Sequence, residues 1–412
     1  MKLVMQVRLL PTPEQAAALE ATMYSCNEAA TWVSQVAFER GQFKNFALRR
    51  HVYGVVKSRW GLGAQAAQQV IKKTCDAYAS LKANLRAGNL GRPGSRRHRQ
   101  ATERPIAFRP QGAQPYDDRM LSWQMPDRTV SVWTTYGRIK NVAFTGSAEQ
   151  LTTLELYRKG ESDLVLRDGM WFLFATCEVP EAPLDTDPED FLGVDLGVVN
   201  IATTSDGEIM AGRALNRMRT RERGLRRKLQ KKNTPSTKRR LRKRRRKEAR
   251  RARDINHKIA KHVVAEAERT GRGIALEDLT GIREWVRLRK PQRATHSSWS
   301  FAQLGSFIAY KGRRAGVLVV YVDPAYTSRT CAECGHIDKA NRVSQAWFAC
   351  RSCGFVDHAD RNSSRNIRAR AWELWRCGAQ SPAPAPTPRK GNGAGRKRSP
   401  TASGARCASP VP

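Results

Sequence analysis

The chain has 412 residues, 40% of them hydrophobic, which is enough to build two or three domains with cores of their own. Lys and Arg number 74 against 37 Asp and Glu, and the formal net charge of +37 predicts a polyanionic partner such as nucleic acid. The sequence lacks an apolar run of about eighteen residues, and Arg8 interrupts its first apolar stretch. We therefore expect neither a membrane span nor a signal peptide, and a cytoplasmic location.

The first hundred residues predict one strand followed by helices. Residues 1–10 alternate enough to form a strand. Thr12 then offers a helix N-cap, Pro13 a first-turn proline and Gln15 the partner of a capping box, so a helix is expected to start there. Residues 64–85 carry a second strong helical pattern of apolar side chains.

After the helical segments, the sequence pattern becomes β-rich. Residues 88–100 combine Gly with Arg and predict a basic loop or linker. Residues 106–179 contain short runs of β-branched and aromatic side chains, with a predicted hairpin turn at Asp168 and Gly169. Residues 180–190, rich in Pro and Asp, predict a boundary before the next domain.

Three acidic residues stand in or beside apolar segments. Asp195 lies within the buried strand pattern FLGVDLGVV, and Glu277 follows the short strand pattern of residues 274–276. Asp360 belongs to the segment CGFVDHADRNSSRNI. Each acid alone is compatible with a strand-end cap or a salt bridge. Together they provide the hard oxygen ligands for a pair of Mg²⁺ or Mn²⁺ ions, which points to phosphodiester hydrolysis.

The cysteines indicate a metal site rather than disulfides. The chain has nine of them, an odd number that favours a reducing compartment. Two Cys-x-x-Cys pairs are separated by fifteen residues, a spacing typical of structural zinc sites with four thiolates. Because four thiolates complete a tetrahedron, His336 and His358 are expected to be bystanders. The predicted zinc ligands are Cys331, Cys334, Cys350 and Cys353.

The positive charge is concentrated in one stretch. Residues 213–253 hold 22 Lys or Arg against two Glu, more than half of the net charge of +37, and Pro235 divides the stretch into two predicted helices. Such charged runs usually form a solvent-exposed face of a helix. Here the positive charges are so dense that they repel one another, which favours contact with nucleic acid. The expected contacts are Arg226, Arg227, Lys228, Lys238, Arg239, Arg240, Arg242, Lys243, Arg244, Arg245, Arg246, Lys247, Arg250 and Arg251.

Several motifs occur in the order found in a known family. Asp195 lies in GVDLGVVNIATTSDG and Glu277 in IALEDLTGI; SSWSFAQLGSFIAYKGRRAG and VDPAYTSRTCAECG follow, and Asp360 lies in the last motif, CGFVDHADRNSSRNI. From about residue 191 to residue 367 the chain closely resembles the TnpB proteins of bacterial insertion sequences, also called OrfB-type transposases. The resemblance is weaker in the N-terminal half.

The resemblance implies an α/β multidomain protein. Its core would be a RuvC-like nuclease of RNase H fold with an inserted zinc ribbon, accompanied by an N-terminal β-barrel wedge domain with a helical recognition insert. Asp195, Glu277 and Asp360 would be the catalytic, metal-binding triad. The expected parts are the wedge domain at 1–10 and 100–182, the helical insert at 11–99, the nuclease domain at 190–330 and 354–375 with its basic helical pair at 213–269, the zinc ribbon at 327–357, and a disordered basic tail at 377–412.

The chain departs from the family pattern in the last motif. Ser363 and Ser364 stand where family members usually have alanines, and His358 stands where they often have an acid. Neither change touches a proposed ligand, so we still expect an active nuclease.

TnpB proteins are RNA-guided DNA endonucleases related to type V CRISPR effectors. The resemblance therefore implies a bacterial, nucleoid-associated enzyme that carries a guide RNA and uses Mg²⁺ or Mn²⁺ to cut matching double-stranded DNA. Two alternatives stay open, since a fold does not fix a function. One is a guide-independent transposase, and the other is a nucleic-acid-binding repressor that does not cut. The sequence does not specify the guide, the DNA motif or the oligomeric state.

Overall fold

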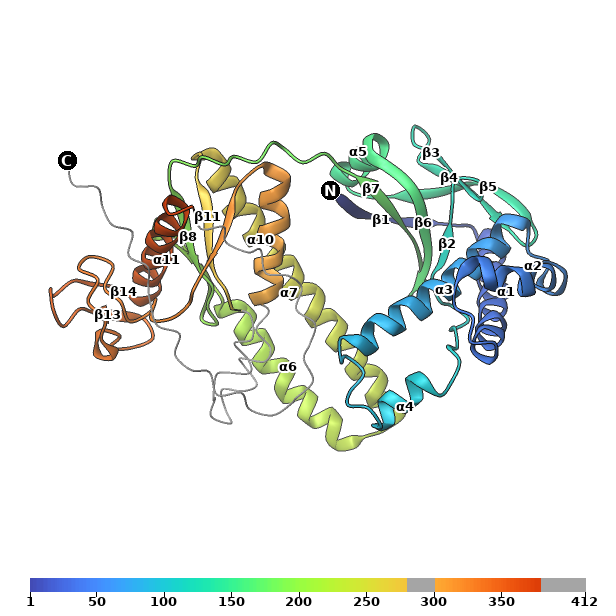
Figure 1. Cartoon of the computed structure of the whole chain (residues 1–412), viewed down its shortest axis with the longest axis horizontal. Helices are drawn as coiled ribbons and strands as arrows, with labels where there is room; N and C mark the ends of the chain where they lie inside the picture. The colour runs from blue at the N-terminus through green and yellow to red at the C-terminus, as the bar shows by residue number, and fades with distance from the viewer. Residues whose placement is uncertain (280–300, 379–412) are drawn as a thin grey trace. The chain divides into compact units, whose positions relative to one another are not determined.

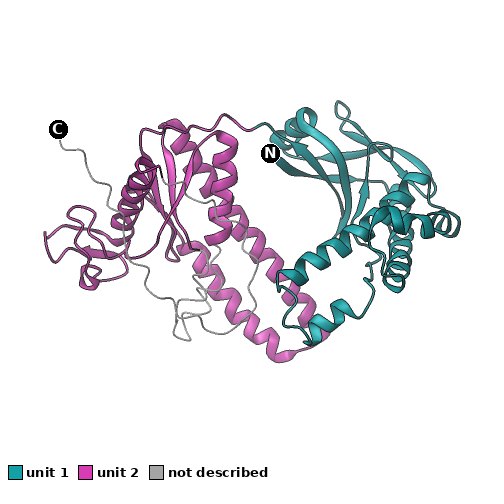
Figure 2. Cartoon of the chain, in the orientation of Figure 1, with its two compact units in different colours: residues 1–180, 388–400 teal, residues 181–387, 401–412 magenta. Residues whose placement is uncertain are grey.

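The computed structural model describes residues 1–279 and 301–378 and divides the chain into two compact units, with the boundary between Pro180 and Glu181 (Figures 1 and 2). Unit 1 ends at Pro180, inside the Pro- and Asp-rich segment, and unit 2 contains the three acids and the cysteine pairs. The predicted disordered tail spans residues 377–412. All but its first two residues lie outside the described residues.

Unit 1 contains a seven-stranded antiparallel sheet with the strand order β2-β6-β7-β1-β5-β4-β3. The predicted first strand is confirmed as β1, which lies in the middle of the sheet. The predicted turn is also confirmed, because Asp168 and Gly169 join β6 to β7 with φ angles of 53° and 77°, as a two-residue hairpin requires. The strands are β1 Lys2–Leu10, β2 Gln114–Tyr116, β3 Leu121–Gln124, β4 Thr129–Thr134, β5 Gly137–Thr145, β6 Arg158–Arg167 and β7 Met170–Glu178.

Two predicted helices of unit 1 are confirmed. The first is α1, Pro13–Glu39, and its start has the expected capping box: Gln15 N–H donates to Thr12 Oγ1 at 3.3 Å, and Thr12 N–H donates to Gln15 Oε1 at 3.0 Å. The second is α3, Ala64–Arg86, which matches the apolar pattern of residues 64–85.

Three further helices were not predicted. They are α2, Asn45–Trp60, α4, Arg96–Thr102, and α5, Ala148–Tyr157. The expectation of a loop or linker over residues 88–100 is wrong for its last residues, because the Ser95 side chain accepts a hydrogen bond from His98 N–H and caps α4. α5 interrupts the β-rich segment, and a capping box between Ser147 and Gln150 starts it.

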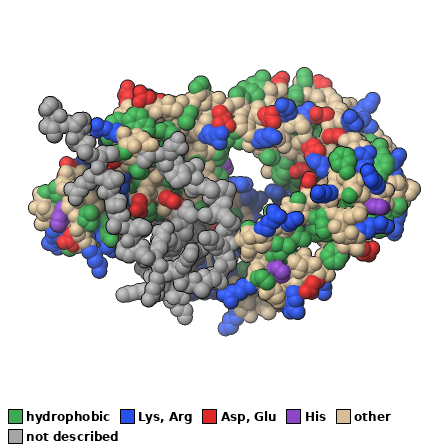
Figure 3. All heavy atoms as spheres, viewed as in Figure 1, with side chains coloured by type: hydrophobic (Ala, Val, Ile, Leu, Met, Phe, Trp, Pro, Cys, Tyr) green, Lys and Arg blue, Asp and Glu red, His purple; other side chains and the backbone are tan. Residues whose placement is uncertain are grey.

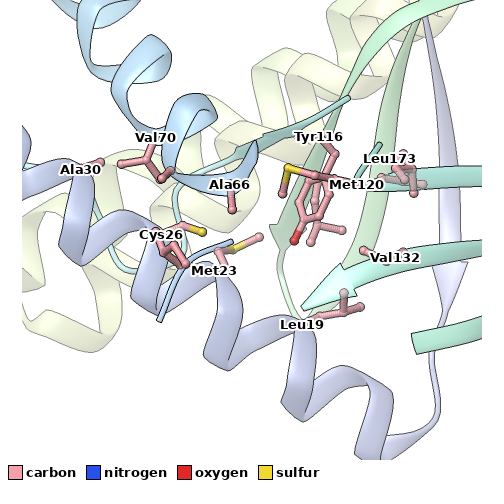
Figure 4. Close-up of a cluster of buried hydrophobic side chains, with 14 of the residues drawn as sticks. Leu19, Met23, Cys26, Ala30, Ala66, Val70, Tyr116, Met120, Val132 and Leu173 are labelled. Atoms are coloured by element: carbon pink, nitrogen blue, oxygen red, sulfur yellow. The ribbon is translucent and has the colours of Figure 1, made fainter. Parts of the chain in front are cut away.

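The core of unit 1 lies between its helices and the sheet. Figure 4 shows side chains of α1 and α3 facing those of the sheet, and the residues of this cluster are almost fully buried. The labelled members are Leu19, Met23, Cys26, Ala30, Ala66, Val70, Tyr116, Met120, Val132 and Leu173.

Unit 2 contains a five-stranded mixed sheet with the order β10-β9-β8-β11-β12. β8, β9 and β10 pair antiparallel, whereas β11 runs parallel to both β8 and β12. The expected strands around Asp195 and before Glu277 are therefore present. The bounds are β8 Phe191–Asp195, β9 Asn200–Thr204, β10 Ile209–Ala211, β11 Gly273–Glu277 and β12 Val319–Val322.

Helices cover both faces of this sheet. On one face Phe191, Ala275 and Val322 pack against α11, Ala359–Arg376. On the other face, the intervening strand residues pack against α7, Pro235–Arg269, and α10, Phe301–Ala315. Strands buried on both faces explain the continuous apolar runs that marked these segments in the sequence.

The basic stretch forms two helices, as predicted. α6 spans Arg213–Lys232, Asn233 adopts a left-handed conformation, and α7 begins at Pro235 with Thr234 as its N-cap. The chain continues from β12 into the cysteine-containing segment, where β13, Trp347–Ala349, pairs antiparallel with β14, Val356–His358, immediately before α11.

Candidate metal centres

The three acids come together at one edge of the unit 2 sheet. Asp195 is the last residue of β8 and Glu277 the last residue of β11, and the preceding residues Val194 and Leu276 are register partners. Because side chains alternate along a strand, Asp195 and Glu277 point to the face that Ala275 shares with α11. α11 contributes the third acid at its second position. The fold therefore places all three acids on one side of the sheet edge.

Burial and mutual repulsion raise the pKa of Asp195. The largest cause is burial, and the carboxylates of Glu277 and Asp360 add to it. Burial also raises the pKa of Glu277, although the hydroxyl of Thr327 donates a hydrogen bond to Glu277 Oε1 and partly opposes the shift. Buried carboxyl groups that repel one another are stabilised by a bound cation.

Asp360 is held by two polar neighbours. Arg342 Nη2 lies 3.2 Å from Asp360 Oδ1, and Asn200 Nδ2 donates to Asp360 Oδ2 at 2.8 Å. The Asp360 side chain is 7% exposed, so these contacts replace solvent almost completely. Sequence reasoning missed Arg342, Asn200 and Thr327, because no local pattern links them to the acids.

The three acids have the oxygen donor atoms that a hard cation prefers, but these atoms do not all lie close to one another. Among the described residues, the four cysteines are the one group of three or more His, Cys, Asp or Glu whose donor atoms all lie within 4.8 Å of one another. The three acids do not meet that distance, and Asp360 contacts Arg342 and Asn200. Their oxygen donors and their negative charge are of the kind that Mg²⁺ or Mn²⁺ prefers.

Close packing explains the small residues around Asp360. A Cβ atom at Gly193 of β8 would lie 2.1 Å from the backbone oxygen of Ser364, so α11 and β8 approach too closely for any side chain there. Ser363 and Ser364 are buried, and Ser364 Oγ donates to the backbone oxygen of Arg361 at 2.8 Å. Serine therefore fits both of these buried positions, and the hydroxyl of Ser364 has a hydrogen-bond partner.

Two asparagines of α11 fix the helix to the segment that leads into the cysteines. Asn366 Nδ2 donates to the backbone oxygens of Thr327 and Thr330, at 2.9 and 2.7 Å. Asn362 donates to Thr330 O at 2.8 Å and accepts from Ala332 N–H at 2.9 Å. These bonds place Asp360 relative to the cysteine segment.

The four cysteines form a compact cluster. Cys331 Sγ lies 3.7 Å from Cys353 Sγ, and Cys334 Sγ lies 3.6 Å from Cys350 Sγ. Tetrahedral zinc with Zn–S bonds of about 2.3 Å requires sulfur atoms about 3.8 Å apart, so the cluster fits zinc. Backbone amides, chiefly that of Cys353, lower the pKa of the Cys350 thiol to about 6, whereas burial raises the pKa of Cys331, so without metal the thiolate form is favoured at Cys350 and not at Cys331.

The turns of the cluster and its histidines agree with a closed four-sulfur site. Gly335 and Gly354 follow the two pairs with φ angles of 72° and 74°, a conformation that favours glycine. His358 caps α11, because its Nδ1 accepts a hydrogen bond from Asp360 N–H at 3.2 Å. Neither His336 nor His358 joins the described metal-binding group, as expected.

Asp206 has a different role from the three acids. It follows β9 and forms a paired interaction with Arg272, whose Nη1 and Nη2 atoms lie 2.9 and 2.6 Å from its two carboxylate oxygens. The hydrogen bond from Arg272 lowers the pKa of Asp206, so it stays charged and structurally engaged.

The helices α6 and α7 present the predicted basic surface. Their two glutamates lie between the helices: Arg244 Nη1 lies 2.6 Å from Glu222, and Arg226 Nη2 lies 2.7 Å from Glu248. These reciprocal pairs connect the helices and neutralise part of their charge. Of the fourteen predicted nucleic-acid contacts, all except the partly buried Arg244 are exposed. None of the described helices is both long enough and apolar enough to cross a membrane.

Two family models match this chain. Residues 174–280 match the family described as a probable transposase, OrfB of IS605 type, and residues 301–367 match the TNB domain of Cas12f1-like proteins. The matched segments contain Asp195, Glu277, the four cysteines and Asp360. The resemblance to the TnpB and OrfB-type family is thereby confirmed for these parts of the chain.

Curated relatives match over shorter segments. The CRISPR-associated endodeoxyribonuclease Cas12f1 of Sulfoacidibacillus thermotolerans is 39% identical over 113 residues, 27% of this chain and 25% of that protein. The TnpB-like protein MJ0751 of Methanocaldococcus jannaschii is 42% identical over 89 residues, 21% of this chain and 32% of that protein. The putative RNA-guided DNA endonuclease InsQ of Escherichia coli is 45% identical over 71 residues, 17% of this chain and 18% of that protein. The matched segments thus span a third or less of each of these relatives.

The overall fold resembles a solved structure more extensively. The Cas12f1 chain in a complex with guide RNA and target DNA superimposes with a TM-score of 0.54, covering 85% of this chain and 82% of that chain at 13% identity. At that identity the likeness concerns the fold alone. The two proteins thus share an α/β architecture over most of this chain.

Proposed function

We propose that this chain, a relative of the TnpB and Cas12f proteins, is a metal-dependent endonuclease that cuts DNA matched by a guide RNA. The observation that carries the proposal is the convergence of Asp195, Glu277 and Asp360 at one sheet edge, inside the segments that match the two family models. Buried carboxyl groups in this arrangement are suited to hold Mg²⁺ or Mn²⁺ and are unfavourable without a cation.

In this proposal each acid holds metal through a carboxylate oxygen. The bound ions would lower the pKa of a water molecule and neutralise the charge on the scissile phosphate. Asn200 and Thr327 orient Asp360 and Glu277 through the hydrogen bonds described above. Arg342 balances the charge of Asp360, which a bound cation would also offset.

The four-cysteine cluster would hold a structural zinc ion. Its four thiolates fill a tetrahedral site, which leaves no position for a reacting water molecule. Asn362, Asn366 and Arg342 connect the segment around the cluster to α11. A zinc ion held there would therefore support the position of Asp360 rather than take part in the chemistry itself.

The basic helices α6 and α7 would contact the phosphate backbones of the guide RNA and of the RNA–DNA hybrid. Their side chains form a dense row of exposed cations, and guided recognition delegates sequence reading to base pairing. A protein that binds backbones in this way needs charge rather than specific base contacts. Association with the DNA of a bacterial nucleoid follows from the same chemistry.

The proposal is tested by the RNA that the protein retains. The gene would be expressed together with its flanking DNA, the protein purified at high salt, and the bound RNA sequenced. We expect one discrete RNA that ends in flanking sequence and supplies the guide. Absence of a discrete RNA would overturn guided cutting; strand joining without RNA would then identify a transposase, and DNA binding without any strand breakage a repressor.

A further inference from the structure

A cavity of about 300 Å³ opens in unit 1 between α1, α2 and the segment that leads to β2. Its α1 wall includes Glu28, Trp32 and Gln35, which are spaced by four and three residues and therefore lie on one face of the helix. The volume falls at the lower end of the range for small-molecule sites. The cavity belongs to none of the metal centres described above.

Aromatic rings form much of the cavity. The centroids of Trp32 and Trp60 lie 5.5 Å apart with an interplanar angle of 46°, so the two indoles converge without stacking on each other. Arg59 lies over the ring of Trp60, 4.9 Å from its centroid. Phe108 lines the cavity too, and its backbone N–H donates to Thr31 Oγ1 at 3.1 Å, which fixes this wall to α1. The cavity thus offers planar aromatic surfaces and includes one cation, Arg59, in its lining.

Apart from Arg59, the polar side chains that line the cavity are acceptors, amides and hydroxyls. Glu28 and Gln35 are exposed, and within the described parts of the chain neither side chain has a hydrogen-bond partner. A carboxylate such as that of Glu28 repels a phosphate but accepts hydrogen bonds from an amino group. Beside Glu28 the site therefore favours a planar heterocycle that carries an amino group over a phosphate.

Further cations lie on α2, the helix that contributes Arg59 and Trp60 to the cavity. Arg49 and Lys57 both lie against the ring of Tyr53, 5.1 and 5.7 Å from its centroid. Figure 3 shows hydrophobic and basic side chains side by side on the part of unit 1 where Figure 1 places α2. Alternation of aromatic and basic side chains is typical of surfaces that bind single-stranded nucleic acid.

We propose that this cavity binds one unpaired nucleobase of a single-stranded RNA or DNA. The base stacks on the indoles of Trp60 and Trp32, its exocyclic amino group donates to Glu28, and the phosphates on either side contact the cations of α2. Adenine, cytosine and guanine carry such an amino group, whereas uracil and thymine do not. The site needs a bound strand but no cleavage, so it can fail without affecting the proposed nuclease activity.

The test uses the full chain, freed of nucleic acid at high salt, and fluorescence anisotropy with short labelled homopolymers. Oligo(A), oligo(C) and oligo(U) of RNA are compared with oligo(A) and oligo(T) of DNA. Trp60→Leu keeps apolar bulk and removes the stacking surface, so we expect about tenfold weaker binding of oligo(A). Because no cation is removed, the dependence of affinity on salt should keep its slope. Tyr136→Leu, at an aromatic residue that is 78% exposed and outside the cavity, is the matched control.

Glu28→Gln tests the assignment of the amino group without removing any ring. We expect it to reduce the preference for oligo(A) over oligo(U) while the protein stays folded by circular dichroism. If the variants lose affinity only for RNA, the bound base belongs to the guide. If they lose affinity only for DNA, it belongs to a target strand. Unchanged affinity and base preference in folded Trp60→Leu and Glu28→Gln would overturn the proposal. The proposal would also be overturned if Tyr136→Leu lost as much affinity for oligo(A) as Trp60→Leu does, or if Trp60→Leu lost as much affinity for an oligonucleotide without bases.

Discussion

The guanidinium of Arg342 lies 3.2 Å from Asp360 Oδ1, so the cysteine-rich segment reaches directly into the cluster of acids. Arg342 is separated from the cysteines by short stretches of chain on both sides, whereas Asp360 begins α11. The contact gives the structural cluster an electrostatic role. Arg342 thus places a cation of the protein beside one of the three acids that we propose to hold metal.

Arg342→Ala should destabilise the metal-free protein by about 2 kcal/mol, the usual range for removal of a hydrogen bond to a charged group. Added Mg²⁺ should reduce this loss, because the ion then balances the charge of Asp360. The measurement is thermal unfolding of wild type and variant with and without Mg²⁺. Arg365→Ala removes a more exposed ion pair to Glu333, also between α11 and the cysteine segment, and should cost less than about 1 kcal/mol regardless of Mg²⁺. Equal losses in both variants, or no effect of Mg²⁺, would contradict this account.

Zinc content should depend on the cysteine cluster alone. Cys334→Ser is expected to reduce bound zinc to a small fraction of the wild-type amount and to unfold the ribbon, since structural zinc sites contribute folding free energy directly. Cys377→Ser, at an exposed cysteine outside the cluster, should retain zinc in full. Elemental analysis and limited proteolysis measure both effects. A variant that loses zinc but keeps a protease-resistant ribbon would refute the structural role.

Replacing exposed cations on α7 should weaken RNA binding and make the affinity depend less on salt concentration. Arg240, Lys243 and Lys247 are exposed and lie on one face of the helix. Their joint replacement by Ala should reduce the slope of log affinity against log salt by about 2, since each single-strand phosphate that a cation neutralises adds roughly 0.7 to that slope.

Arg226→Ala is the control for this charge effect, because Arg226 is already paired with Glu248. Arg226→Ala should change the salt slope by less than the roughly 0.7 expected for one unpaired cation, because Arg226 already shares its charge with the carboxylate of Glu248. Filter binding over a range of salt concentrations measures both slopes. An unchanged slope in the triple variant would remove α7 from the RNA-binding surface.

Lys73 in unit 1 should make stability depend on pH. Burial lowers the pKa of Lys73 from 10.5 to about 8, even though its Nζ atom donates to Asn27 Oδ1 at 2.7 Å. Between pH 8 and pH 10.5 the unfolded chain binds a proton that the folded chain has released, so this residue's contribution to the unfolding free energy rises with pH.

The matching comparison is between wild type and Lys73→Met. Their difference in unfolding free energy should shift in favour of the wild type by up to about 3 kcal/mol across this interval. Urea unfolding at several pH values measures the difference, which cancels the other groups that titrate there. A difference that stays constant with pH would show that Lys73 is protonated in the folded protein throughout.

Elements with local start or turn signals were predictable from the sequence. Thr12 and Gln15 indicated the start of α1, Asp168 and Gly169 the turn between β6 and β7, and Pro235 the start of α7. The helix α2 was missed because its N-cap position, a lysine, makes no side-chain capping bond. The helix α5 was missed because it lies between strands, where the surrounding β pattern outweighed its capping box.

The acids could be proposed from their motifs, but their neighbours could not. Asn200 contacts Asp360 across 160 positions of sequence, and Thr327 contacts Glu277 across 50. Periodicity and spacing describe only residues that are close along the chain, so they carry no information on such contacts. The roles of the three acids in catalysis therefore stay a prediction, supported by their common position at the sheet edge.

The central claim is tested most directly by cleavage of a DNA duplex that matches the retained RNA. Wild type, Asp195→Ala and Asp206→Asn would be compared with and without Mg²⁺. Asp206 is an acid of the same unit that is bound to Arg272 rather than to the cluster, so its variant is the matched control. We expect Mg²⁺-dependent cutting by wild type and Asp206→Asn, and a loss of roughly a thousandfold or more in Asp195→Ala with DNA binding retained, as removal of a metal ligand implies. Cutting by Asp195→Ala at the wild-type rate would contradict the account.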